Sequence, residues 1–129
     1  MHKILLSIVL LSSALFSLEW VKDVPTAFAV AQKEHKNVMV FVESQTCRWC
    51  KKMKYRTFSD EAVQKRLESF VVVKVMSEDV DATKYLPAIQ GAPTTFFMKE
   101  NKEVLQEVLG YFNAEDFIAY INDAQSITK

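Results

Sequence analysis

Hydrophobic positions along the chain follow two patterns, continuous runs typical of buried strands and spaced positions typical of amphipathic helices. Continuous β-prone runs lie at 38–42 and 70–75, as expected for strands that are covered on both faces. Two further strands are expected at 94–98 and 104–109. The polar residues 100–102 lie between this second pair, so the pair is predicted to form a hairpin.

Helical spacing occupies the segments between these strands. We expect a first helix over 25–35 that starts near Pro25, because proline is tolerated in the first turn of a helix. Other helices are expected from the cysteine pair onwards, after Ser59 and Asn113 as N-cap residues, and in a short turn over 82–86. Alternating helices and strands followed by a hairpin predict an α/β fold with a mixed central sheet and helices on both faces.

The length and composition of the chain bound the number of domains. Its 129 residues are one domain's worth, and 50% hydrophobic with 12% aromatic residues is enough apolar material for a core. Residues 18–129 contain no repeat, low-complexity tract or Ser/Gly/Pro-rich linker. They are therefore predicted to form a single domain.

The N-terminal residues are typical of a secretory signal peptide. Lys3 supplies a positive start, an apolar run follows at 4–11, and Ser12 and Ala14 offer small residues for a cleavage site. We therefore expect a leader over approximately residues 1–17 and a protein that is periplasmic or secreted. A buried helix and an uncleaved membrane anchor are the alternatives, although an anchor needs about 20 apolar residues to span a bilayer.

Charge and cysteine content exclude several classes of protein. Sixteen Lys and Arg balance sixteen Asp and Glu, so no global field attracts nucleic acid or an acidic membrane surface. Two cysteines, Cys47 and Cys50, exclude a multi-disulfide scaffold and a four-cysteine zinc site. A mixed zinc site would need two further ligands, and His2 and His35 are the only histidines. We expect no bound metal.

The two cysteines are separated by two residues, directly after a predicted strand and at the start of a predicted helix. Unpaired N–H groups at such a helix start stabilise a thiolate, and the pKa of the first cysteine falls from about 8.5 to roughly 3.5–7.5. Cys47 can then attack a substrate disulfide, and Cys50 can resolve the mixed disulfide. The alternatives are half of a metal site or an inert disulfide, which gains little stability from so short a loop.

Three segments together carry a resemblance to a known family. Residues 46–53 with the two cysteines, 57–60, and 89–94 ahead of a strand are similar to thioredoxin-fold oxidoreductases. The closer similarity is to the exported thioredoxin-like subgroup with a Cys-X-Trp-Cys site, and it extends over residues 25–124. The resemblance implies a thioredoxin-like fold and a redox-active Cys47–Cys50 disulfide with no other cofactor.

The resemblance also assigns a substrate-binding segment to Ala92, Pro93 and Thr94. It implies that the bond before Pro93 is cis and that the backbone at Ala92 pairs with an extended substrate segment beside the reactive sulfur. An ordinary trans turn proline is the alternative. Gly110 either matches a glycine that the family places under the site or simply ends a strand.

Two positions depart from the family pattern. Phe41 stands six residues before Cys47, where thioredoxin carries a buried aspartate, and Glu43 returns to the same face of the strand. Our hypothesis is that Glu43 takes the Cys50 proton during resolution, and the alternative is a solvated glutamate at the strand end. Tyr55 replaces a kinking proline, so this helix is expected to run straighter.

The two residues between the cysteines are expected to tune the redox chemistry. Arg48 favours the thiolate of Cys47 and so moves the pair toward the oxidising end of the scale. Trp49 is expected either to offer an apolar platform to flexible substrates or to shield the disulfide from solvent. Further cations act in the same direction or, as we favour for the lysines, form a solvated helix face: Lys51, Lys52, Lys54 and Arg56.

The sequence therefore predicts an exported thiol-disulfide oxidoreductase that reduces disulfides in periplasmic proteins. The segment between Val75 and Pro93 has no room for the large helical insertion of the family's dedicated oxidants. A reductase in an oxidising compartment needs an electron donor, by analogy a membrane thiol-disulfide carrier. We expect a monomer whose other partners are protein thiols and disulfides. The alternatives are a disulfide oxidant or isomerase, and a copper-binding module for which Met53 alone is near the motif.

Overall fold

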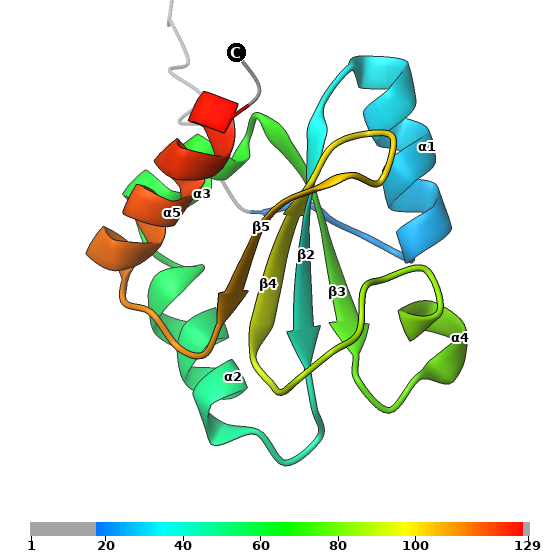
Figure 1. Cartoon of the computed structure of the whole chain (residues 1–129). Helices are drawn as coiled ribbons and strands as arrows, with labels where there is room; N and C mark the ends of the chain where they lie inside the picture. Colours follow the sequence, from blue (N-terminus) through cyan, green and yellow to red (C-terminus); the bar gives the residue numbers. More distant parts are fainter. Residues whose placement is uncertain (1–17, 128–129) are drawn as a thin grey trace, which may run out of the picture.

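A five-stranded sheet forms the centre of the structure, a computed structural model that describes residues 18–127 (Figure 1). The strand order is β1-β3-β2-β4-β5, and the strands are β1 (Trp20–Val21), β2 (Asn37–Glu43), β3 (Phe70–Met76), β4 (Thr94–Met98) and β5 (Val104–Leu109). β3 is parallel to β1 and β2, whereas β4 is antiparallel to β2 and β5 is antiparallel to β4. The predicted leader lies outside the described residues.

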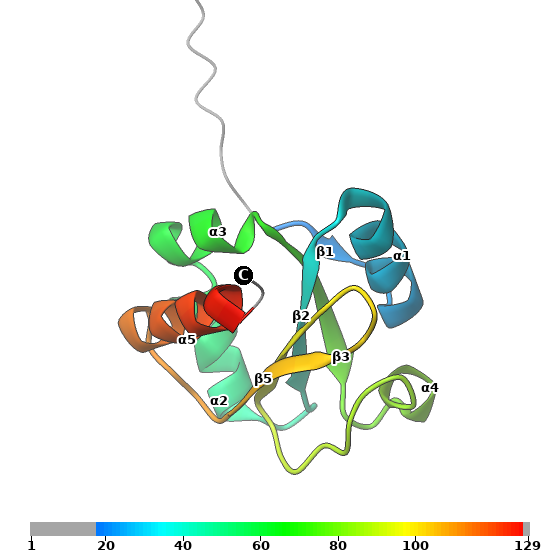
Figure 2. The ribbon, with the colours of Figure 1, turned by 45° about the horizontal axis from the view of Figure 1, so that its top comes forward.

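Helices cover both faces of this sheet, as Figure 1 and Figure 2 show. One face carries α1 (Val24–Glu34) and α4 (Val80–Thr83). The other carries α2 (Arg48–Lys52), the π-helix η1 (Met53–Thr57), α3 (Glu61–Leu67) and α5 (Ala114–Ile127). The predicted α/β class with a mixed sheet between two layers of helices is confirmed.

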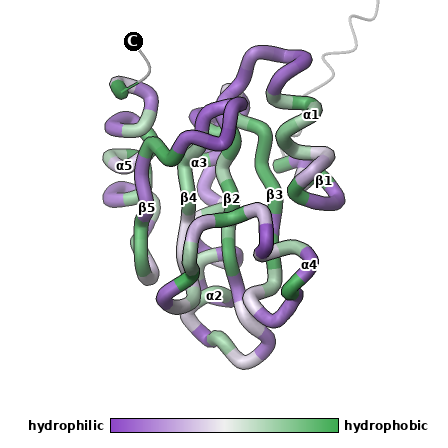
Figure 3. The backbone as a smooth tube through the Cα atoms, turned by 45° about the vertical axis from the view of Figure 1, so that its right-hand side comes forward, coloured by the Kyte–Doolittle hydropathy of each residue, from purple (hydrophilic) through white to green (hydrophobic). Residues whose placement is uncertain are grey.

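The two faces of the sheet bury different side chains. The face under α1 is mainly aliphatic, because the valines of β2 and β3 pack there around Phe28. The face under α2, α3 and α5 is aromatic, with the ring of Phe58 edge-on to Phe41 and Phe117 at centroid distances of 4.8 Å and 5.5 Å. Both faces are covered, which explains why the central strands in Figure 3 are hydrophobic along most of their length.

α1 begins and ends at residues with clear capping geometry. Asp23 Oδ1 accepts a hydrogen bond from the backbone N–H of Thr26 at 2.8 Å, and Pro25 lies in the first turn as predicted. The helix ends at His35, which adopts the left-handed conformation with φ 54°. Hydrogen bonds from Thr26 hold the pKa of Asp23 below its ordinary value of 3.8, so this cap is strongest when Asp23 is ionised.

The structure corrects three local predictions. Asp60, and not Ser59, is the N-cap of α3, because Asp60 Oδ1 accepts from the N–H of Val63 at 3.0 Å. The helical turn expected over 82–86 is α4, which starts two residues earlier because Asp79 caps it. β1 is an unpredicted strand, and its two residues pair with β3 at the edge of the sheet.

The longest helix of residues 18–127 is α5, with 14 residues. Within this part of the chain no helix is both long and apolar enough to cross a membrane.

Candidate active site

The cysteine pair lies directly beyond the carboxyl end of the central strand β2. A loop of residues 44–46 leads from Glu43 to Cys47, which is the N-cap of α2 (Figure 1). β2 is paired with β3 on one side and with β4 on the other, so the loop starts from the central strand of the sheet. The fold therefore presents Cys47 at a fixed edge, as the spacing in the sequence predicts.

Cys47 and Cys50 form a disulfide, with their Cα atoms 5.2 Å apart. The two sulfurs differ in access, because Cys50 is 1% exposed within the core and Cys47 is half-buried. The backbone N–H of Cys50 points at Cys47 Sγ at 3.1 Å. An N–H aimed at this sulfur favours negative charge on Cys47 once the disulfide is opened. The geometry therefore makes Cys47 the accessible sulfur and Cys50 the buried one.

The Ala92–Pro93 peptide bond is cis, and the segment before β4 lies against the same core cluster as the cysteines. Ala92 and Cys47 are both partly buried against the cluster that contains Cys50. The backbone of this segment is fixed at two points, by a bond from the Gly110 N–H to the Pro93 carbonyl (2.8 Å) and by one from Thr94 Oγ1 to the Gly91 carbonyl (2.6 Å).

Gly110 ends β5 with φ +102°, a conformation that side chains with a Cβ rarely adopt. Gly110 therefore has two structural roles. It terminates the strand, and its N–H supports the segment that carries Pro93. Ala92, Pro93 and Thr94 thus lie at the same end of the sheet as the cysteines, since Thr94 pairs with Val42 near the end of β2. Their part in substrate binding stays a prediction.

The position of the missing aspartate is filled by the aromatic core. Phe41 is fully buried and contacts Phe58, so no ionisable group lies at that point of the strand. Glu43 is 8% exposed, and its Oε1 accepts a bond from Lys54 Nζ at 2.5 Å. The alternative of a solvated glutamate at the strand end is wrong, since Glu43 is buried and ion-paired.

The helix that follows the cysteines changes from α-helical to π-helical hydrogen bonding, where Tyr55 in place of a proline led us to expect a straighter helix. Regular α-helix ends at Lys52, and in η1 the N–H of Phe58 bonds to the carbonyl of Met53 at 3.0 Å, five residues back. This wider turn carries Lys54 toward β2 and leaves Tyr55 78% exposed. π-Helical turns inside helices are frequent at functional sites.

Aromatic and cationic side chains gather on the outer side of α2. Trp49 is 44% exposed, and its ring lies 5.7 Å from that of Tyr111, which follows β5. Lys52 Nζ lies over both rings, 5.1 Å from Trp49 and 4.7 Å from Tyr111, and Arg48 lies 5.1 Å over Trp49. The reading of Lys52 as part of a solvated face is thus incomplete. Tyr111 was not singled out from the sequence, because only the fold brings it to α2.

No three His, Cys, Asp or Glu side chains come together as a metal site in residues 18–127. Met53, the sulfur ligand considered for copper, is fully buried in the aromatic core.

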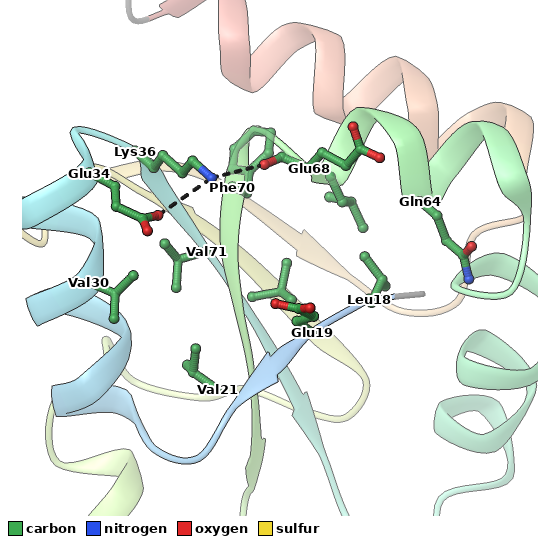
Figure 4. Close-up of a pocket in the computed structure, with 12 residues that line it drawn as sticks. Leu18, Glu19, Val21, Val30, Glu34, Lys36, Gln64, Glu68, Phe70 and Val71 are labelled. Carbon is green, nitrogen blue, oxygen red and sulfur yellow. Dashed lines mark hydrogen bonds and ion pairs between the residues drawn. The ribbon is translucent and has the colours of Figure 1, made fainter. Parts of the chain in front are cut away.

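A pocket of about 420 Å³ lies at the opposite end of the sheet, between α1, α3 and the edge strand β1 (Figure 4). Its walls include Leu18, Val30, Leu67 and Phe70, and Lys36 at its rim contacts Glu34 and the Glu68 carbonyl. Beyond the cysteines, by contrast, α2 and η1 carry only a shallow depression, which is lined by Lys51, Lys52, Lys54 and Tyr55. The site is therefore a surface rather than an enclosed cavity.

The sequence is similar to known proteins along most of its length. The family model of the thioredoxin-like domain matches residues 24–125. Human Spermatogenesis-associated protein 20 is 34% identical in an alignment of 119 positions that covers 83% of this chain and 15% of that protein. The thiol:disulfide interchange protein DsbD of Escherichia coli K12 is 34% identical in an alignment of 104 positions that covers 75% of this chain and 18% of DsbD. The chain thus spans less than a fifth of these curated relatives.

Solved structures share the fold. A thioredoxin from Thermus thermophilus superposes with a TM-score of 0.72 at 26% identity, covering 84% of this chain and 88% of that one. The oxidised C-terminal domain of DsbD from Neisseria meningitidis gives a TM-score of 0.65 at 24% identity, covering 78% and 91%.

Proposed function

The chain belongs to the thioredoxin-like family and is a thiol-disulfide oxidoreductase, and we propose that it reduces disulfides in periplasmic proteins through Cys47 and Cys50. The observation that carries the proposal is the asymmetry of the pair. One sulfur is accessible at the start of α2, and its partner is buried one turn further on. Attack and resolution require this division between the two cysteines.

The reaction consists of two thiol-disulfide exchanges. In the reduced protein the Cys47 thiolate attacks one sulfur of the substrate disulfide, forms a mixed disulfide and releases the other substrate sulfur as a thiolate. Cys50 then loses its proton and attacks Cys47 Sγ, which closes the Cys47–Cys50 bond and releases the second substrate thiolate. Two electrons pass from the protein to the substrate, and the two thiolates take up protons. A thiol donor must then reduce the Cys47–Cys50 disulfide again.

Glu43 is our proposed acceptor for the Cys50 proton. Its side chain lies on the face of β2 that carries Phe41, and Phe41 belongs to the same buried cluster as Cys50. Lys54, which binds the Glu43 carboxylate, is four residues after Cys50 and therefore on the same side of the helix. These placements support a carboxylate near the buried sulfur, whether the proton moves directly or through a water molecule.

Resolution kinetics in Glu43→Gln test this role. We expect the mixed disulfide to resolve more slowly in the variant, with a changed pH profile, because the amide cannot accept the proton. Glu107→Gln, an exposed carboxylate on β5, is the matched control. An unchanged pH profile in Glu43→Gln would show that Glu43 does not accept the proton.

The reducing direction is supported by the segment between β3 and β4, in which the described residues 77–93 contain only the four-residue helix α4. An equilibrium redox titration with thiol trapping tests it, run beside assays of disulfide reduction and of thiol oxidation. We expect efficient reduction and a midpoint nearer to about −270 mV than to about −120 mV. A midpoint at the oxidising end with efficient oxidation would reject the reductase.

Export rests on the N-terminal sequence pattern, and a membrane thiol-disulfide carrier is proposed as the electron donor. Fractionation of cells together with the mass of the purified protein tests the location. We expect a periplasmic protein cleaved after Ala14 or Ser17. Full-length protein in the membrane fraction would indicate an uncleaved anchor, and full-length protein in the cytoplasm would reject export.

A further inference from the structure

We infer that the surface beside Cys47 selects disulfides whose cysteines are flanked by Asp or Glu side chains. This inference rests on the proposed function and names the class of substrate or donor protein that the site prefers. The surface, called the cationic face below, consists of three cations and two aromatic rings: Arg48, Lys51, Lys52, Trp49 and Tyr111.

The cationic face holds a local excess of charge on a protein whose total charge is zero. Residues 44–59 contain five cations and no Asp or Glu. Of the five, Lys54 is neutralised by Glu43, whereas the other four form no ion pair within residues 18–127. Cations left without acidic partners beside a reactive sulfur are complementary to an acidic partner.

The loop on the other side of Cys47 does not cancel this charge. The carboxylate of Glu78 bonds to this loop, because its Oε1 accepts a hydrogen bond from the backbone N–H of Gln45 at 3.1 Å. Glu78 follows β3 in the chain, and it forms no ion pair with a cation of α2 among residues 18–127. A substrate that approaches Cys47 along α2 therefore meets uncompensated positive charge.

Two of the cations are held in place by the aromatic rings. The ammonium of Lys52 lies over both Trp49 and Tyr111, and the guanidinium of Arg48 lies over Trp49. Cation–π contacts restrict these long side chains before a partner arrives, so less conformational entropy is lost when a carboxylate binds them. Neither side chain forms a hydrogen bond to another described residue, which leaves its donors available.

The cationic face lies within reach of a substrate joined to Cys47. Lys51 is four residues after Cys47, with its N–H bonded to the Cys47 carbonyl at 3.2 Å, so both side chains lie on one side of the helix. Arg48 follows Cys47 directly. The shallow depression lined by Lys51, Lys52, Lys54 and Tyr55 continues from there along the helix and offers space for residues that flank the substrate cysteine.

Three disulfide-bonded peptides of one sequence test the inference, with Glu, Gln or Lys beside each cysteine. The rate constant of the reduced protein with each peptide is divided by that of dithiothreitol, because flanking charges also change the intrinsic reactivity of a disulfide. At about 10 mM salt we expect the Glu peptide to react about tenfold faster than the Gln peptide and the Lys peptide to react slowest. At about 1 M salt, where the Debye length is about 3 Å, the rates should converge.

Charge-reversed variants locate the effect. Lys51→Glu and Lys52→Glu should each reduce the preference for the Glu peptide, whereas Lys65→Glu, an exposed residue on α3, should leave it unchanged. Equal normalised rates for the three peptides at low salt would overturn the inference, as would a preference that survives in both variants. The wild-type salt series keeps the test valid even where a variant fails to fold.

A neutral small disulfide, 2-hydroxyethyl disulfide, distinguishes the loss of the charge preference from the loss of the proposed activity. If the reduced protein reacts with this compound and with all peptides at equal normalised rates, the inference alone is wrong. If it reacts with none of them, the proposed function fails as well.

Discussion

The two ends of the sheet differ, because one end has an enclosed pocket and the other has the reactive disulfide. At the amino end of β2 and β3 lies a pocket of about 420 Å³ with apolar walls, and Lys36 at its rim is already bonded to Glu34 and Glu68. At the carboxyl end lie the disulfide, the cis peptide bond and the unpaired cations, on an open surface. The enclosed space and the reactive sulfurs therefore lie at different ends of the sheet, and the sulfurs lie on an open surface.

The pocket at one end and the position of Cys47 at the other are explained by the lengths of a strand and of a connecting loop. β1 has only two residues, so it covers β3 at Val72 and Val73 and leaves Phe70 and Val71 at the wall of the pocket. At the other end only four residues separate β2 from α2, and this short connection holds Cys47 close to the sheet. Substitutions at the pocket end and changes at the disulfide should therefore affect stability and thiol-disulfide exchange differently.

The largest expected change in stability lies at the pocket end. Leu67→Ala removes a side chain that is 1% exposed at the end of α3, and we expect the free energy of unfolding to fall by about 2–5 kcal/mol. Urea denaturation measures it, and Lys65→Ala, two residues away and exposed, is the control. The rate of thiol-disulfide exchange with a substrate disulfide should be the same in the folded variant as in the wild type. A parallel loss of exchange activity under folding conditions would contradict the separation of the two ends.

Opening the disulfide at the other end should cost less. Cys47 and Cys50 are three positions apart, and closing so short a loop stabilises the native state by about 2 kcal/mol or less in the chain-entropy description. Urea denaturation with and without dithiothreitol measures the difference. A loss larger than that of Leu67→Ala would mean that the bond has a structural role beyond its chemistry.

α3 connects the two ends, and its cap should have an intermediate effect. Asp60→Ala removes the acceptor for the Val63 N–H, and we expect a loss of about 1 kcal/mol in the free energy of unfolding. Asp60→Asn should retain most of this stability, since the amide oxygen can also accept. Ser59→Ala, at the residue that the sequence suggests as the cap, should cost less than Asp60→Ala. The reverse order would show that the cap is misassigned.

The smallest expected effect is the pH dependence of the α1 cap at Asp23. Its pKa is lowered in the folded protein, so its contribution to stability is present above the ordinary value of 3.8 and is lost as the pH falls through the lowered pKa. The difference in melting temperature between the wild type and Asp23→Ala should therefore narrow below pH 3.8. A difference that stays constant with pH would show that the ionised carboxylate is not the stabilising form.

The sequence predicted those strands and helices whose apolar residues follow a regular local pattern. The bounds of β4 and β5 are those expected, because their apolar runs end at turn residues, and β2 and β3 differ by one residue or so at their ends. β1 was missed because two residues show no period. The π-helical turn was missed because a shift in backbone hydrogen bonding leaves no mark on the pattern of apolar residues.

In the candidate site, too, some residues could be identified from short segments of sequence and others could not. The cysteines and Pro93 were identified from local spacing and resemblance, since their positions depend on short segments of chain. The contacts of Tyr111 with Trp49 and of Lys54 with Glu43 join residues that are far apart or on different elements. Only tertiary packing brings these side chains together, so no local pattern could reveal them.

The burial of Cys50 also bears on how the protein withstands oxidative damage. Peroxides reach the half-buried Cys47 first, since Cys50 is 1% exposed. A sulfenic acid formed on Cys47 lies next to the Cys50 thiol, which can displace water from it and close the disulfide before irreversible sulfinic acid forms. The same bond that ends each catalytic cycle thus returns an oxidised Cys47 to a state that a thiol donor can reduce.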